Sequence, residues 1–374
     1  MSGIYIHIPF CKQACYYCDF HFSTSLKRKS EMINAIAREL ALRKNEVNEV
    51  VESIYFGGGT PSLLNIEDLY FLIDAIHKNY RVSDIIEITL EANPDDLSKT
   101  KIIELSKTPI NRLSIGIQSF YDDDLKMMNR AHSSEESGKC LSVATNYFEN
   151  ITIDLIYGIT NMSTDKWKQN LHKTFDFGIS HISSYALTVE PKTALYNFIK
   201  TGKYPPLDEN LASQHFDILV DETSAHGYVQ YEISNFGKPD YYSKHNTSYW
   251  KGRAYLGVGP SSHSFNGKQR SWNVANNSKY LKGINANELS CEIETLSQSD
   301  KFNELIMTGL RTIWGVSLSR VEKEYGLEVK KELLRNGKNH IANDSLEIIN
   351  DVLFVTRKGK FLADGIASDL FLVT

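Results

Sequence analysis

The amino-acid sequence predicts an α/β protein whose larger part is a parallel (βα) barrel. Two observations support this fold class: β-rich runs recur six times with helix-length spacers, and chemically active residues follow the ends of those runs. With 374 residues, the chain is long enough for one such domain and a smaller second one. The expected strands are Ile4–Ile8, Ser53–Phe56, Ile85–Leu90, Arg112–Ile117, Ile151–Ile156 and His181–Leu187.

The spacer between the second and third strands has the pattern of an amphipathic helix. Its apolar residues recur at intervals of three and four, after an asparagine, Asn65, that can cap a helix N-terminus. A helix here supports a repeated βα unit. The apolar stripe consists of Leu69, Leu72, Ile73 and Ile76.

Polar residues and glycines at the strand ends favour a barrel over an open sheet. Each expected strand but the last is followed by residues that core packing does not require. Functional groups at the carboxyl ends of successive strands are typical of barrel enzymes. These groups are Cys11, Cys15 and Cys18, the run Gly57 to Pro61, Glu91, Gln118 and Asp154.

The second half of the chain changes in composition. Residues 200–290 are rich in Tyr, Asn, Ser and Gly, and we expect loops and short elements that cover the barrel. From about Ser299 the pattern predicts two or three helices and a β-hairpin, a compact domain of winged-helix type. The expected domains are therefore a barrel at 1–235, a covering segment at 236–298 and a C-terminal domain at 299–374.

Composition and charge exclude several classes of protein. Hydrophobic residues make up 41% and charged residues 23%, values typical of a globular protein. No apolar run approaches the roughly 18 residues that would cross a bilayer, and the N-terminus has no secretory signal, so we expect a cytoplasmic protein. The net charge is −5, and the segment from Asp300 to the end contains 11 basic and 11 acidic residues. This balance of charge argues against nucleic-acid binding.

Three of the five cysteines lie within eight residues, as Cys11, Cys15 and Cys18 in the pattern CxxxCxxC. Three thiolates on one loop can hold three irons of a cubane cluster and leave the fourth iron open to a small ligand. A zinc site with His21 as fourth ligand is one alternative. Inert core thiols are another. Cys140 and Cys291 lie far from this motif and are expected to be structural.

CxxxCxxC with Tyr17 before its last cysteine resembles the radical S-adenosylmethionine (SAM) superfamily. Within it, the whole chain is similar to the oxygen-independent coproporphyrinogen oxidases and the related HemW haem chaperones, including the motif from His245 to Trp250. The resemblance implies a partial six-unit barrel, a 4Fe-4S cluster on the three cysteines, and SAM in the barrel mouth. It assigns SAM contacts to Tyr5, Tyr17, Gly58, Gly59, Thr60, Glu91, Gln118, Arg130 and Asp154.

Two departures distinguish between the two related groups. The oxidases carry a further cysteine two residues after the motif, where this chain has Phe20, and they have a long N-terminal extension that is not seen here. We therefore expect a haem chaperone that delivers haem to recipient haem proteins. If the chain is an enzyme, we expect a SAM-dependent coproporphyrinogen III dehydrogenase of porphyrin biosynthesis.

His245 is the candidate haem ligand, because a neutral imidazole commonly ligates haem iron and Tyr249 and Trp250 can pack against a porphyrin. A loop histidine anchored by two aromatic residues is the alternative. His263 is a second conceivable ligand, with a polar role in the core favoured. The resemblance also makes a homodimer and a peripheral membrane encounter conceivable, and no catalytic residue is assigned.

Overall fold

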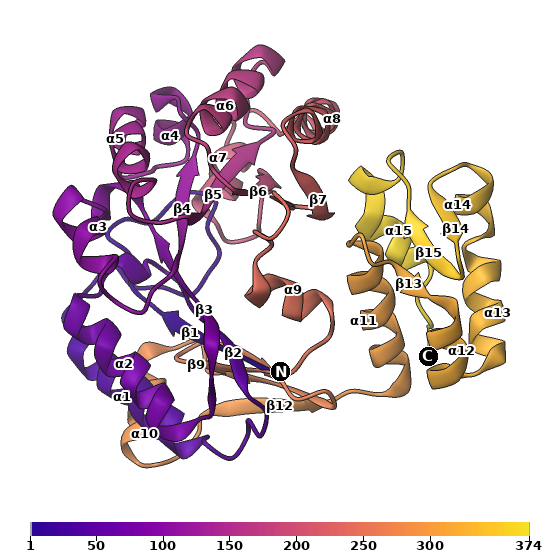
Figure 1. The fold of residues 1–374 in the computed structure, drawn as a ribbon. Helices are drawn as coiled ribbons and strands as arrows, with labels where there is room; N and C mark the ends of the chain where they lie inside the picture. Colours follow the sequence, from indigo (N-terminus) through magenta and orange to yellow (C-terminus); the bar gives the residue numbers. More distant parts are fainter. Residues whose placement is uncertain (1, 374) are drawn as a thin grey trace.

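The computed structural model describes residues 2–373, which form a partial barrel and a smaller C-terminal domain (Figure 1). Six parallel strands stand side by side in chain order, which confirms the predicted α/β fold class. Each observed strand covers most or all of its expected run and shifts its ends by a few residues. The strands are β1 (Ser2–Ile8), β2 (Val51–Gly58), β3 (Val82–Ala92), β4 (Arg112–Gln118), β5 (Asn150–Tyr157) and β6 (His181–Ala186).

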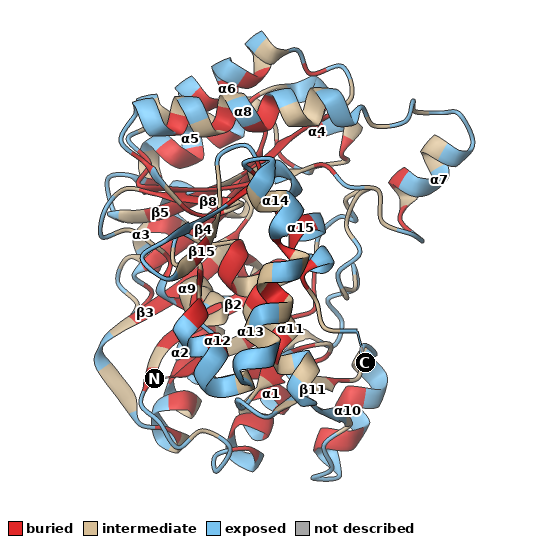
Figure 2. Cartoon of the chain, turned by 90° about the vertical axis from the view of Figure 1, so that its right-hand side faces the viewer, coloured by how far each residue is buried: buried red, intermediate tan, exposed pale blue. Residues whose placement is uncertain are grey.

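Helices cover the outer face of these strands, with their exposed sides toward solvent (Figure 2). The predicted helix after Asn65 is present, and a capping box between Asn65 and Asp68 fixes its start. Within residues 2–373, no helix combines the length and the apolar character that a membrane span requires. The helices are α1 (Lys29–Leu42), α2 (Ile66–Asn79), α3 (Lys99–Leu105), α4 (Asp122–Met127), α5 (Ser134–Ala144) and α6 (Thr164–Asp176). The next helix, α7 (Ala194–Lys200), stands apart from the sheet (Figure 2).

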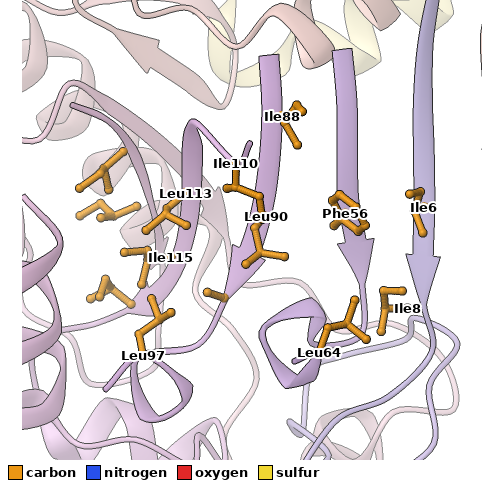
Figure 3. Close-up of a cluster of buried hydrophobic side chains, with 14 of the residues drawn as sticks. Ile6, Ile8, Phe56, Leu64, Ile88, Leu90, Leu97, Ile110, Leu113 and Ile115 are labelled. Atoms are coloured by element: carbon orange, nitrogen blue, oxygen red, sulfur yellow. The ribbon is translucent and has the colours of Figure 1, made fainter. Parts of the chain in front are cut away.

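Side chains alternate between the two faces of each barrel strand. In β1, Ile4, Ile6 and Ile8 are fully buried in the hydrophobic core, whereas the intervening Tyr5 and His7 face the barrel interior. Neighbouring strands contribute matching apolar residues, as Figure 3 shows for Phe56, Leu90 and Leu113. The apolar side chains on the outer face of the strands therefore pack against the helices, whereas polar side chains line the barrel interior.

The stretch from 200 to 290 is more regular than its composition suggested. It contains the 17-residue helix α8 (Glu209–Ala225), whose buried Phe216 and Leu219 face the core. It also extends the sheet at both ends, with β9 pairing parallel to β1 and β8 pairing antiparallel to β6. The further elements are β7 (Val229–Glu232), β8 (Asn235–Gly237), α9 (Lys244–Trp250), β9 (Tyr255–Val258), β10 (His263–Phe265), β11 (Gln269–Asn273), α10 (Asn277–Asn285) and β12 (Cys291–Thr295).

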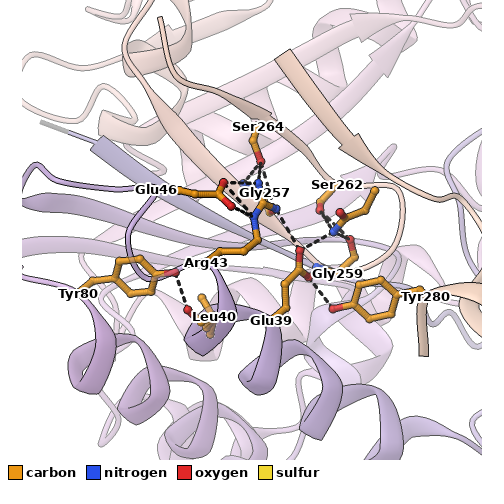
Figure 4. Close-up of polar contacts among 11 residues, drawn as sticks. Glu39, Leu40, Arg43, Glu46, Tyr80, Gly257, Gly259, Ser262, Ser264 and Tyr280 are labelled. Carbon is orange, nitrogen blue, oxygen red and sulfur yellow. Dashed lines mark hydrogen bonds and ion pairs between the residues drawn. The ribbon is translucent and has the colours of Figure 1, made fainter. Parts of the chain in front are cut away.

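A buried ion pair ties this extension to the barrel (Figure 4). Glu39 of α1 and Arg43, the residue that follows the helix, lie 3.0 Å apart and are both buried. Arg43 also donates to the Gly257 carbonyl at 2.8 Å, and Glu39 accepts from the Tyr280 hydroxyl at 2.6 Å. Because both charges are hydrogen-bonded as well as paired, the network offsets the desolvation that burial imposes.

The C-terminal domain has its own hydrophobic core, around Phe302, Ile306 and Leu333. Its order of helix, strand, helices and hairpin is that of a winged helix, as predicted. Arg311 joins it to the barrel, with Nη2 2.8 Å from the Glu232 carboxylate. The elements are α11 (Gln298–Leu310), β13 (Val316–Ser317), α12 (Leu318–Tyr325), α13 (Leu327–Asn336), α14 (Lys338–Ala342), β14 (Leu346–Ile349), β15 (Val352–Val355) and α15 (Ala363–Asp369).

Candidate functional site

The cysteine loop follows β1 at the carboxyl end of the barrel strands. Main-chain hydrogen bonds hold it in place: the Cys11 amide donates to Ser23 at 3.1 Å, and the Tyr16 amide donates to Met128 at 3.1 Å. The Leu195 amide of α7 donates to the Tyr16 carbonyl at 2.8 Å. Contacts from three separate segments thus fix the backbone of the loop before any group binds to it.

All three thiols are free and only partly exposed. Burial, followed by the charges of the neighbouring thiols, raises the pKa of Cys18 to about 11, so a bound cation is needed to stabilise its thiolate. Among residues 2–373, no three His, Cys, Asp or Glu side chains converge on one ion position. The three thiols lie on one short loop, and soft sulfur ligands suit iron–sulfur chemistry.

His21 is held by contacts outside the cysteine loop. Its Nε2 lies 2.8 Å from Asn277 Oδ1, and its carbonyl accepts from the His7 ring at 2.9 Å. One nitrogen of the imidazole is therefore engaged with α10, which disfavours His21 as the fourth ligand of a zinc site.

The glycine run packs against β1 more tightly than we expected. A Cβ on Gly59 would lie 2.6 Å from the Phe10 carbonyl oxygen, and Gly58 has a φ of +104° that favours glycine. The amides of Gly58, Gly59 and Thr60 donate to Glu91, Ile8 and Phe10 respectively. Because these donors are occupied, the carbonyl oxygens are the backbone groups of the run that remain as candidates for a ligand amine.

Glu91 stands near the end of β3 and faces the barrel interior. Its carboxylate accepts from the Tyr55 hydroxyl at 2.8 Å and from the Gly58 amide at 3.2 Å. Burial, with a smaller contribution from the nearby Asp154 carboxylate, raises its pKa to about 7. A cationic ligand amine at this position would favour the ionised form of Glu91.

Arg130 links the cysteine loop to the ends of β3 and β4. Its guanidinium donates to Asn93 Oδ1 at 2.6 Å, to the Gly116 carbonyl at 2.9 Å and to the Cys15 sulfur at 3.4 Å. Its Nε is buried and has no partner among the described residues. An unpartnered buried guanidinium N–H beside the cysteines fits a ligand carboxylate. Tyr17 lies against the same guanidinium.

The other three expected SAM contacts also face the barrel interior. Burial raises the pKa of Asp154 to about 6, and its carboxylate accepts from the Ser114 hydroxyl at 3.5 Å. Gln118 is buried at the end of β4 with a φ of +64°. The Tyr5 hydroxyl lies 3.2 Å from His7 Nδ1. The strands thus bring these side chains to the interior of the barrel.

His245 is placed differently from a residue that offers a free nitrogen to haem. It is 1% exposed, and its Nδ1 lies 2.8 Å from Ser53 Oγ while its Nε2 lies 2.6 Å from the Tyr249 hydroxyl. Haem ligation by one ring nitrogen of His245 would break the hydrogen bond at that nitrogen. His263 is exposed on β10, so the expected role in the core is wrong for that residue.

Several interior residues were not identified from the sequence. Tyr55 stacks on His245 with ring centroids 4.9 Å apart and also orients Glu91, and Asn93 positions Arg130. The sequence could have placed Tyr55 in the barrel interior, because the polar and small residues of β2 alternate with its apolar core residues. Asn93 has no comparable signal, since its role arises from a contact between separate loops.

Known proteins are similar to this chain in sequence and in architecture. A family model described as Radical SAM superfamily matches residues 5–173, and one described as HemN C-terminal domain matches residues 296–362. The heme chaperone HemW of Bacillus subtilis is 32% identical over 97% of this chain and 97% of its own length; that of Lactococcus lactis is 33% identical over 98% of each. The structure of coproporphyrinogen III oxidase (HemN) from Escherichia coli superimposes with a TM-score of 0.85 at 21% identity, covering 99% of this chain and 89% of the oxidase, which shows a common fold. The chain therefore belongs to the HemW family of the radical SAM superfamily.

Proposed function

We propose that this protein is a haem chaperone that holds a 4Fe-4S cluster and SAM in the barrel mouth and delivers haem to recipient haem proteins. The observation that carries the proposal is the similarity to HemW along almost the whole chain, together with three thiols at the barrel mouth beside an unpartnered guanidinium N–H. We place this activity in the cytoplasm.

Each residue at the barrel mouth has a separate task in this proposal. Cys11, Cys15 and Cys18 ligate three irons, and Arg130 Nε binds the carboxylate of SAM. Glu91 accepts from the amine, and Asp154 accepts from a ribose hydroxyl. Gln118, Tyr5 and the carbonyl oxygens of the glycine run complete the pocket.

The cluster and SAM together supply one-electron reductive cleavage of a carbon–sulfur bond. The protein orients the two groups and excludes water from them. Its interior is closed toward the other end of the barrel by α9, because Glu87 accepts from the amides of Lys244 and His245 at 3.0 Å each. The buried His245 ring, stacked on Tyr55, extends this closure.

A haem-transfer experiment tests the proposal. The protein is reconstituted with iron and sulfide under anaerobic conditions, loaded with haem, and mixed with a haem-free recipient protein whose absorption changes on haem uptake. We expect transfer from the wild type. Cys11→Ala should lose iron and transfer, whereas Cys291→Ala, a partly exposed cysteine away from the loop, should retain both. A wild type that binds no haem, or never releases it, would refute the proposal.

The same preparation tests the oxidase alternative. We expect no carbon dioxide or protoporphyrinogen when it is incubated with SAM, a reductant and coproporphyrinogen. Formation of these products at a catalytic rate would assign the decarboxylation activity instead.

A further inference from the structure

A cleft lies between the barrel extension and the C-terminal domain. It has a volume of about 590 Å³, within the range typical of small-molecule and cofactor sites. One wall comes from α9, the turn after it and β9 to β11, and the other comes from α11, α12 and the segment between them. Figure 1 shows α9 between the barrel strands and the C-terminal domain.

The walls of the cleft are rich in aromatic rings. Trp250, Tyr255 and Phe265 line the barrel side, and Trp314 and Tyr325 line the side of the C-terminal domain. Rings on two facing walls provide flat apolar surface for a planar conjugated ligand. Such an arrangement can contact both faces of the ligand.

The cleft is also basic, although the whole chain is acidic. Five Lys and Arg residues line it, against two Glu residues. The two carboxylates are paired within the cleft, Glu304 with Arg270 and Glu324 with Arg320. Among the described residues, no carboxylate pairs with the remaining cations, which are Lys251, Arg253 and Lys301. The Lys251 ammonium lies 4.2 Å from the Trp314 ring centroid, so it reaches across the cleft.

Unpaired cations around aromatic walls suit a planar aromatic molecule with two carboxylates. Haem has this chemistry, with a flat conjugated ring and two propionates at one edge. No histidine, cysteine or methionine lines the cleft, so an iron ligand there must be a phenol. Three tyrosines line the cleft, and the Tyr249 hydroxyl is bonded to His245, whereas the Tyr255 and Tyr325 hydroxyls have no hydrogen-bond partner among the described residues. Of these two, Tyr255 lies on the same wall as Arg253.

We infer that this interdomain cleft is the haem-binding site, in which Arg253 and Lys301 hold the propionates and the Tyr255 phenolate ligates ferric iron. The inference rests on the proposed chaperone function and locates its cargo. It places haem outside the barrel, and it leaves His245 as a buried residue that supports α9 through Tyr249 and Ser53. Cluster and haem then occupy separate parts of the molecule.

Haem titration of the full-length, cluster-loaded protein tests the inference, with the Soret absorption as readout. Arg253→Glu combined with Lys301→Glu should weaken haem binding at least about tenfold, because each change replaces attraction by repulsion. Lys168→Glu combined with Lys107→Glu, at two exposed lysines away from the cleft, is the charge-matched control and should bind as the wild type does. Haem dimethyl ester, which lacks the propionate charges, should bind the double variant and the wild type with similar affinity.

Tyr255→Phe tests the iron ligand separately. It should remove the phenolate-to-iron charge-transfer band of the ferric complex, whereas His245→Ala should leave that band in place. Wild-type affinity in the double variant, with loss of haem in His245→Ala, would overturn the inference and leave the chaperone function standing. Failure of the wild type to bind haem at all would overturn both.

Discussion

Replacing Glu91 by Gln should stabilise the cluster-free protein and weaken SAM binding. The pKa of this carboxyl is about 7 in the folded protein, because burial raises it from 4.5. The folded state therefore binds the proton more tightly than the unfolded state, and stability from this group is lost as the pH rises from 4.5 to 7. The difference between the two pKa values corresponds to about 3 kcal/mol above that window.

Gln removes the buried charge but keeps an oxygen that can accept a hydrogen bond. It keeps one of the two bonds from Tyr55 and Gly58, and each such bond contributes about 0.5–1.5 kcal/mol. We therefore expect Glu91→Gln to unfold with a free energy about 1.5–2.5 kcal/mol higher than the wild type at pH 8. At pH 4 the gain should vanish, because wild-type Glu91 is then protonated in both states.

Guanidinium unfolding of the reduced, cluster-free protein at the two pH values measures this effect. Calorimetric titration of the cluster-loaded protein measures SAM affinity, which should fall at least about tenfold in Glu91→Gln. Glu347→Gln, an exposed carboxyl on β14, should change neither quantity. A Glu91→Gln variant that is less stable than the wild type at pH 8, or that binds SAM equally well, would refute the reasoning.

Three further changes have defined outcomes. Arg130→Lys retains the charge but loses the Nε–H donor, so SAM should bind roughly ten to a hundred times more weakly by calorimetry while the iron content stays unchanged. Glu39→Ala removes the acceptor of three buried donors, on Gly259, Asn273 and Tyr280, while Arg43 keeps its pair with Glu46. It should lower the unfolding free energy by about 3–5 kcal/mol in denaturant titrations, and an unchanged midpoint would contradict the network. Gly59→Ala forces a Cβ against the Phe10 carbonyl and should destabilise the protein by about 1–3 kcal/mol in thermal unfolding; an unchanged melting temperature would contradict this.

The sequence predicted the six parallel strands because each is a short β-rich run with a strong local signal, and it predicted α2 from an apolar stripe and its Asn65 cap. It did not predict α8, because an average over residues 200–290 hides the periodicity around Phe216. The parallel pairing of β9 with β1 joins residues some 250 positions apart, and no local pattern reports such a contact.

The site shows the same division between local and long-range information. Cys11, Cys15 and Cys18 lie on one loop, so their spacing pointed to a shared metal site, and the resemblance to the radical SAM superfamily specified a 4Fe-4S cluster. The burial of His245 could not be predicted in this way. One of its hydrogen-bond partners, Tyr249, is four residues away on the same helix, but the other, Ser53, comes from the distant strand β2. The occupied amides of Gly59 and Thr60 likewise depend on how closely β1 approaches.

Spectroscopy of the cluster tests the central claim most directly. The anaerobically reconstituted protein is reduced and mixed with SAM labelled with ¹⁵N in its amine and ¹⁷O in its carboxylate, and electron–nuclear double resonance is recorded on the paramagnetic cluster. The account predicts hyperfine coupling from both labels, since one iron has no cysteine ligand and binds SAM. A colourless protein that retains zinc, or a cluster with no coupling to either label, would contradict it.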